Sequence, residues 1–142
     1  MSDLVADTDV VSFMFKNHSI GRLYGPEFTD RQPVISFMTL AELERWAIQY
    51  NWGPRRIQRL FVFLERFIVI PSSKDLCHKW AEVMVAAQAA GRRIETADAW
   101  IAATALLQGV PLVTHNRTDY LGVPGLTIIS HAPTGEQSLL AE

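Results

Sequence analysis

Short apolar runs alternate along the chain with longer amphipathic stretches. The runs at 4–6, 33–38, 68–71, 111–114 and 126–130 are rich in Val, Ile and Leu and favour β-strands. Between them, apolar residues recur at helical spacing: in 39–51, Leu40, Leu43 and Ala47 share one face. Strands that alternate with helices are typical of an α/β fold with a mainly parallel sheet.

The same patterns predict the lengths of the helices. We expect helices over 39–51, 54–67, 72–91 and 96–109, and a short one from residue 9 to about residue 15. Gly91 and Gly109 suit the position that follows a helix. Residues 17–33, interrupted by Gly and Pro, are predicted to be a loop with room for one helical turn. Residues 1–131 are therefore expected to form one domain, and 132–142 a flexible tail.

Composition narrows the class of protein. The 142 residues are 49% hydrophobic and 20% charged, as in ordinary globular proteins. A net charge of −2 argues against binding nucleic acid by overall charge, although a local basic patch stays open. The single cysteine, Cys77, excludes an intramolecular disulfide and suits a reducing compartment. No apolar run approaches the roughly 20 residues of a membrane span, and no basic segment precedes the first one, so we expect a cytoplasmic protein without a membrane partner.

Acidic residues follow the first two strands, and each has a simple structural explanation. Asp7 and Asp9 flank Thr8 directly after the first apolar run, and Asp and Thr are good helix N-caps. Glu42 stands three residues after Thr39, which is the spacing of a capping box. Taken alone, neither motif requires a catalytic role.

Two later sites add to this pattern. Asp98 lies near the start of a predicted helix, where the helix dipole favours a carboxylate by ~0.3–1 kcal/mol. It is the only ionisable residue in an otherwise apolar segment, so it needs a partner such as a bound cation. Asn116 and Asp119 follow the strand at 111–114, where Asn and Asp also form turns.

The carboxyl ends of parallel strands and the amino ends of the helices that follow them lie along one edge of the sheet, where ligands bind. Asp7, Glu42, Asp98, Asn116 and Asp119 are therefore expected to converge. Oxygen ligands suit Mg²⁺ or Mn²⁺. No His or Cys cluster has the spacing of a zinc site.

Three segments in this order resemble a known family: DTDVVS at 7–12, ISFMTLAEL at 35–43 and DAWIAATALLQGVPLVTHNRTDY at 98–120. They are similar to segments of the PIN-domain ribonucleases and, within that family, of the VapC toxins of prokaryotic toxin–antitoxin modules. The resemblance extends from Leu4 to Ser130, and its most specific part is 98–120. It implies a three-layer α/β/α domain around a mainly parallel sheet.

The resemblance also implies roles for single residues. Asp7 and Asp98 match metal-binding acids, and Glu42 matches the family's glutamate after the second strand; with Asp119 they form the expected catalytic set. Many relatives carry an acid where this chain has Asn116, so Asn116 or Asp119 completes the fourth position. Thr8 and Thr114 match supporting polar residues.

The implied reaction is Mg²⁺- or Mn²⁺-dependent hydrolysis of RNA, which leaves a phosphate on the downstream fragment and a hydroxyl on the upstream one. The implied partners are the RNA substrate, a cognate antitoxin protein and a second copy of the chain in a homodimer. In the family, the helices expected here at 39–51 and 54–67 form the antitoxin groove, to which Trp46, Phe61 and Phe63 would contribute.

Arginines are the candidates for contact with RNA phosphates. Arg92, Arg93 and Arg117 are preferred because they flank the acidic segments in the sequence. A second group lies in the helix at 54–67 and its end, where a solvated face is the simpler interpretation: Arg55, Arg56, Arg59 and Arg66.

Two other functions fit parts of the sequence. The DTDVV segment is also similar to the start of haloacid-dehalogenase-type phosphatases, with Asp7 as nucleophile and Asp9 as acid/base. That class needs a downstream lysine and a late GDxxxD-like acidic run, and only Lys74 and Lys79, inside a predicted helix, are available. The other alternative is a PIN-like module that binds RNA or a partner with little catalysis.

Overall fold

A computed structural model describes residues 3–133 of the chain. It contains one five-stranded sheet in the order β3-β2-β1-β4-β5, and every neighbouring pair is parallel. The strands are β1 (Asp3–Ala6), β2 (Gln32–Ser36), β3 (Ile68–Ile70), β4 (Leu112–Val113) and β5 (Ile128–Ile129). The five predicted strands and the α/β/α class are confirmed.

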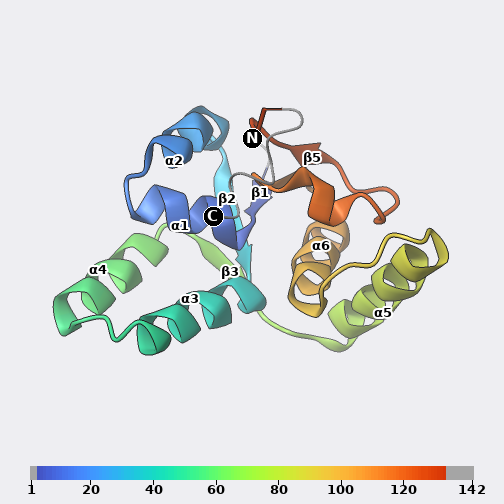
Figure 1. The fold of residues 1–142 in the computed structure, drawn as a ribbon, viewed down its shortest axis with the longest axis horizontal. Helices are drawn as coiled ribbons and strands as arrows, with labels where there is room; N and C mark the ends of the chain where they lie inside the picture. The colour runs from blue at the N-terminus through green and yellow to red at the C-terminus, as the bar shows by residue number, and fades with distance from the viewer. Residues whose placement is uncertain (1–2, 134–142) are drawn as a thin grey trace.

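Helices cover both faces of this sheet, as Figure 1 shows. One side carries α1 (Thr8–Phe15), α2 (Ser19–Tyr24), α3 (Phe37–Gln49) and α4 (Pro54–Leu64). The other side carries α5 (Lys74–Ala89) and α6 (Thr96–Gln108). Two short 3₁₀ segments complete the described part: η1 (Gly25–Phe28) and η2 (Arg117–Tyr120).

The core follows from the alternation of side chains along the strands. Val5 and Val34 pack into an apolar cluster with α5 and α6. Their neighbours Ala6 and Ile35 face the opposite way and pack with residues of α1, α3 and α4. β1 and β2 are thus buried on both faces, which explains their apolar runs at 4–6 and 33–35.

Two segments differ from the sequence prediction. Residues 17–33 hold α2 and η1 instead of a loop with one turn, and the His18 ring begins α2 by accepting a hydrogen bond from the Ile20 N–H at 3.1 Å. The predicted strand at 33–38 ends at Ser36. Ser36 Oγ caps α3 by accepting from the Met38 N–H at 3.0 Å. The predicted Thr39–Glu42 capping box is therefore wrong, because both residues lie inside the helix.

The strand order places a topological switch at the centre of the sheet. The chain passes from β1 to β2 on one side, whereas β4 pairs with the other side of β1. Residues after β1 and after β4 therefore meet at one edge, where ligands bind in open α/β sheets. No helix between residues 3 and 133 combines the length and the apolarity needed to cross a membrane. Most of the predicted tail at 132–142 lies outside the described residues.

Candidate active site

Asp7 lies at the centre of the switch point, between β1 and α1. It is 5% exposed and caps α1, because its Oδ1 accepts a hydrogen bond from the Thr8 N–H at 2.7 Å. Its Oδ2 accepts from the Thr114 hydroxyl at 2.7 Å and from the Tyr120 hydroxyl at 2.9 Å. Asp7 is thus both a helix cap and a buried carboxylate held by two hydroxyl groups.

Tyr120 links Asp7 to Asp98. Its hydroxyl lies 3.4 Å from Asp98 Oδ1, and its ring is 1% exposed. Asp98 stands in the first turn of α6 and is half-buried. Two acids separated by 91 residues in the sequence therefore share one hydrogen-bond donor, which sets their relative positions.

Glu42 joins the same site through Thr8. The Thr8 hydroxyl donates to Glu42 Oε1 at 2.7 Å and lies 2.9 Å from the buried Thr39 hydroxyl. Position 39, read from the sequence as a helix cap, instead connects α3 to α1. The predicted convergence of Asp7, Glu42 and Asp98 is present in the fold.

Asp9 lies in the first turn of α1. Its Oδ2 accepts hydrogen bonds from the Asn116 side-chain amide at 2.8 Å and from the His115 N–H at 3.1 Å. The Asn116 N–H donates to the Thr114 hydroxyl at 3.1 Å. The segment after β4 thus reaches Asp7 through Thr114 and Asp9 through Asn116.

Burial and mutual repulsion raise the pKa values of Asp7, Asp9 and Asp98. Burial, with the nearby Glu42 charge, raises the pKa of Asp7 from 3.8 to about 6, although three hydrogen bonds favour its ionised form. Burial and the charges of Asp7, Asp119 and Glu42 raise the pKa of Asp98 to about 7. The pKa of Asp9 is also well above its usual value, because of burial and the charge of Asp7.

Asp119 and the predicted basic residues are exposed. Asp119 is exposed on η2, but partial burial of its carboxyl group and the Glu95 charge raise its pKa. Its charge in turn helps to raise the pKa of Asp98. Arg117 is exposed at the start of η2. Arg92 and Arg93 are exposed between α5 and α6, and Arg93 lines a hollow of about 510 Å³ with Glu95.

The oxygen atoms of this site suit a divalent cation that keeps part of its water shell. Between residues 3 and 133, no three His, Cys, Asp or Glu side chains are close enough to enclose a metal by themselves. Mg²⁺ commonly uses only one or two carboxylates and keeps several waters. Asp7 and Asp98, which the Tyr120 hydroxyl connects, supply two carboxylates of that kind, and a cation would relieve the repulsion that raises their pKa values.

Tyr120 and Thr39 were missed as site residues, and Asp9 was given a catalytic role only in the phosphatase alternative. One weak indication of a role for Tyr120 was present in the sequence: it directly follows Asp119, in a segment already expected at the sheet edge. Lys79, one of the two lysines available to the phosphatase alternative, forms an ion pair with Glu82 on α5 at 3.1 Å. This pairing argues against that alternative.

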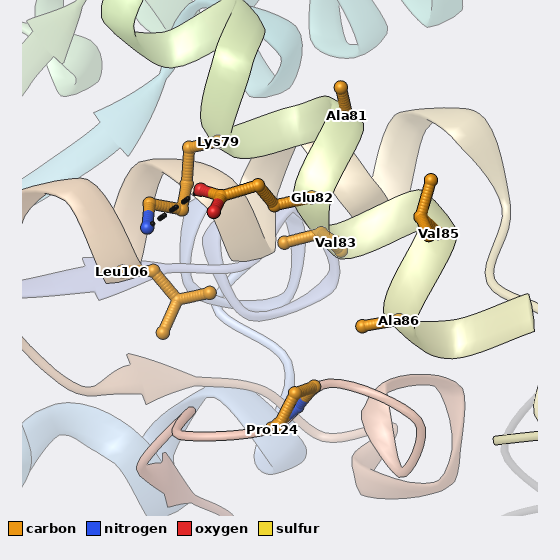
Figure 2. Close-up of a pocket in the computed structure, with 8 residues that line it drawn as sticks. All are labelled: Lys79, Ala81, Glu82, Val83, Val85, Ala86, Leu106 and Pro124. Carbon is orange, nitrogen blue, oxygen red and sulfur yellow. Dashed lines mark ion pairs between the residues drawn. The ribbon is translucent and has the colours of Figure 1, made fainter. Parts of the chain in front are cut away.

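A separate hollow of about 600 Å³ lies over the surface of α5 (Figure 2). Its lining includes Val83, Ala86, Leu106 and Pro124, and its one acid is Glu82, which pairs with Lys79. It contains none of the acids that meet at the switch point, so the candidate chemistry does not lie there.

Comparison with known proteins gives an independent view of this arrangement. A family model described as PIN domain matches residues 4–120. Ribonuclease VapC1 of Haemophilus influenzae (strain R2866) is 28% identical over 125 residues, which cover 84% of this chain and 91% of that protein. Ribonuclease VapC4 of Mycobacterium tuberculosis is 29% identical over 98 residues, 68% of this chain and 75% of the relative.

Solved structures agree in fold. VapBC2 from Rickettsia felis, bound to a promoter DNA fragment, superposes with a TM-score of 0.79 at 21% identity, over 90% of this chain and 98% of that chain. DNA-bound VapBC from Salmonella typhimurium superposes with a TM-score of 0.75 at 25% identity, over 92% and 98% of the two chains. The three-layer architecture is therefore shared with these proteins.

Proposed function

Since the chain belongs to the PIN-domain family, we propose that it is a metal-dependent endoribonuclease, the toxin of a toxin–antitoxin pair. The observation that carries the proposal is the Asp7–Tyr120–Asp98 connection at the switch point of the sheet. It places two acids with raised pKa values where the fold binds ligands. The named relatives VapC1 and VapC4 are ribonucleases and support the choice of RNA as substrate.

In this proposal Asp7 and Asp98 hold Mg²⁺ or Mn²⁺, with Glu42 and Asp119 beside them. When bound, such an ion stabilises charge on phosphate oxygens and makes water a stronger nucleophile. Thr114 and Tyr120 orient the Asp7 carboxylate, and Thr8 orients Glu42. Asn116 positions Asp9, which faces the hollow along α1.

The test is RNA cleavage by the purified protein. Total RNA is incubated with Mg²⁺ or Mn²⁺, with EDTA, and with the variant Asp98→Asn. We expect discrete fragments that EDTA abolishes and that Asp98→Asn reduces at least 100-fold. Asp75→Asn, at an exposed acid in the first turn of α5, is the matched control and should cleave normally. Uncut RNA from folded, metal-loaded wild type would contradict the proposal. The remaining alternative would be a PIN-like module that binds RNA or a partner with little catalysis.

We also propose an antitoxin partner and a homodimer. Similar chains were solved as VapBC assemblies and as a toxin–antitoxin complex from Klebsiella pneumoniae, which supports the first of these. Expression of the wild type alone should arrest growth, whereas expression of Asp98→Asn should not. Equal growth of both strains at matched protein levels would contradict a toxin role. It would not change the conclusion drawn from the nuclease assay.

A further inference from the structure

A row of three hollows runs from the acids along α1 and α4. The first, of about 540 Å³, is lined by residues that include Asp9, Lys16, Tyr50 and Arg56. The second, of about 370 Å³, shares Lys16 and Arg56 with the first and adds Arg59. The third, of about 560 Å³, shares Arg59 with the second. Because neighbouring hollows share lining residues, we treat them as one continuous feature, the basic trough.

Five cationic residues line the trough: Lys16, Arg55, Arg56, Arg59 and Arg66. Among the residues that the structure describes, its only acidic lining residue is Asp9, at the end beside the candidate active site. Within residues 3–133 the ion pairs are Lys79–Glu82, His78–Glu82 and His131–Glu27, so none of the five cations is neutralised there. A chain with a net charge of −2 thus concentrates positive charge on one surface, which complements a polyanion.

Aromatic rings hold two of these arginines in place. The Arg56 guanidinium lies 3.9 Å from the centroid of the Trp52 ring, and that of Arg66 lies 4.6 Å from the centroid of Phe63. A guanidinium that stacks through its face keeps its N–H edge free for phosphate oxygens. The Trp52 ring also stacks on Phe15 of α1 at 5.8 Å, which fixes the floor between α1 and α4.

Tyr50 supplies a different kind of contact. It stands at the end of α3 with 65% of its surface exposed and lines the first hollow. Single-stranded nucleic acids are bound by aromatic rings that stack on bases, next to cations that follow the backbone. Bases in a duplex are already stacked on their neighbours, so an exposed ring favours an unpaired strand.

We propose that the basic trough binds a single-stranded segment of RNA adjacent to the bond that is cleaved. Tyr50 stacks on a base, and Lys16, Arg56 and Arg59 contact successive phosphates that lead from the acids along α4. The inference rests on the proposed ribonuclease function and extends it by naming the binding surface. It also moves the main phosphate contacts away from Arg92 and Arg93, which lie between α5 and α6 on the other side of the sheet, and from Arg117 on η2.

The test measures binding separately from cleavage. Fluorescence anisotropy of a labelled 12-nucleotide single-stranded RNA is recorded in EDTA at several KCl concentrations. Lys16→Gln and Arg56→Gln should each weaken binding several-fold and reduce the slope of log K against log salt by about 0.7, the value for one phosphate on a single strand. Tyr50→Ala should weaken binding about fivefold or more with an unchanged slope, because stacking releases no counterion.

Arg45→Gln is the matched control, since Arg45 is exposed on α3 and does not line the trough. It should leave both the affinity and the slope unchanged. Wild-type affinity and slope in all three trough variants would overturn the inference and leave the surface to a protein partner.

A parallel cleavage assay separates the two proposals. Trough variants that bind RNA weakly, in a protein whose wild type cuts none, would support RNA binding by the trough and contradict the ribonuclease function. Normal cleavage by the trough variants at RNA concentrations below KM would overturn the inference and keep the function.

Discussion

At the scale of single residues, the site depends on hydroxyl groups as much as on acids. Thr8, Thr114 and Tyr120 each present a hydroxyl to a carboxylate. Burial raises the pKa of Tyr120 well above 10.0, so its phenol remains a donor at neutral pH. Such donors hold buried acids in a fixed orientation in the absence of a cation.

Tyr120→Phe tests this role. Loss of the hydroxyl removes a hydrogen bond that lowers the pKa of Asp7, so we expect that pKa to rise above about 6. The free energy of unfolding at pH 8 should fall by about 2 kcal/mol, as for a buried hydrogen bond to a charged acceptor. Carboxyl NMR titration and urea unfolding measure the two effects. The control Tyr50→Phe alters an exposed phenol and should change neither; an unshifted Asp7 in Tyr120→Phe would refute the assignment.

At the scale of elements, the contact between α1 and α2 depends on one glycine. A Cβ at Gly21 would lie 2.6 Å from the backbone carbonyl carbon and oxygen of Phe13, which is far below van der Waals contact. The two helices therefore pack backbone to backbone. This packing keeps the short helix α2 against α1, the helix that Asp7 caps.

Gly21→Ala should consequently destabilise the protein by about 1–3 kcal/mol, the usual cost of overpacking. Gly53→Ala is the matched control, because its extended backbone (φ −71°, ψ 165°) suits Ala before a proline and nothing lies within 4 Å of its Cβ position. Loss of this glycine N-cap should cost less than about 1 kcal/mol. Thermal unfolding measures both variants, and equal melting temperatures would contradict the close approach of α1 and α2.

At the scale of the whole molecule, clustered acids link stability to pH. Asp7 and Asp98 have higher pKa values in the folded chain than the 3.8 expected when unfolded. The folded state therefore binds more protons between pH 4 and about 7, and their contribution to stability is lost as pH rises through that window. For Asp7, which is almost fully buried, the loss is on the order of 3 kcal/mol.

Unfolding in EDTA should accordingly show a larger loss of stability from pH 4 to pH 8 in the wild type than in Asp98→Asn. Addition of 5 mM Mg²⁺ at pH 8 should raise the melting temperature of the wild type, because a cation offsets the repulsion among ionised carboxylates. Asp98→Asn should respond much less. If the wild type and the variant show the same pH profile and the same response to Mg²⁺, Asp98 does not hold the ion.

The elements themselves could be predicted from local patterns. Periodicity located the five strands and the longer helices, since each pattern repeats within a few residues. Errors arose where two local signals competed. Phe37 and Met38 are apolar enough to extend a strand, but Ser36 caps a helix before them. His18 begins α2 in a segment whose Gly and Pro residues indicated a loop.

The amino-acid sequence by itself determined which acids end strands and begin helices, and therefore the edge at which Asp7, Glu42 and Asp98 meet. Only the tertiary structure decided their connections, because these depend on strand order. Tyr120 reaches Asp7 across 113 residues since β4 pairs with β1. The four arginines of the basic trough form one group in the sequence, but only the packing of α1 against the α3–α4 segment brings Lys16 and Tyr50 beside them.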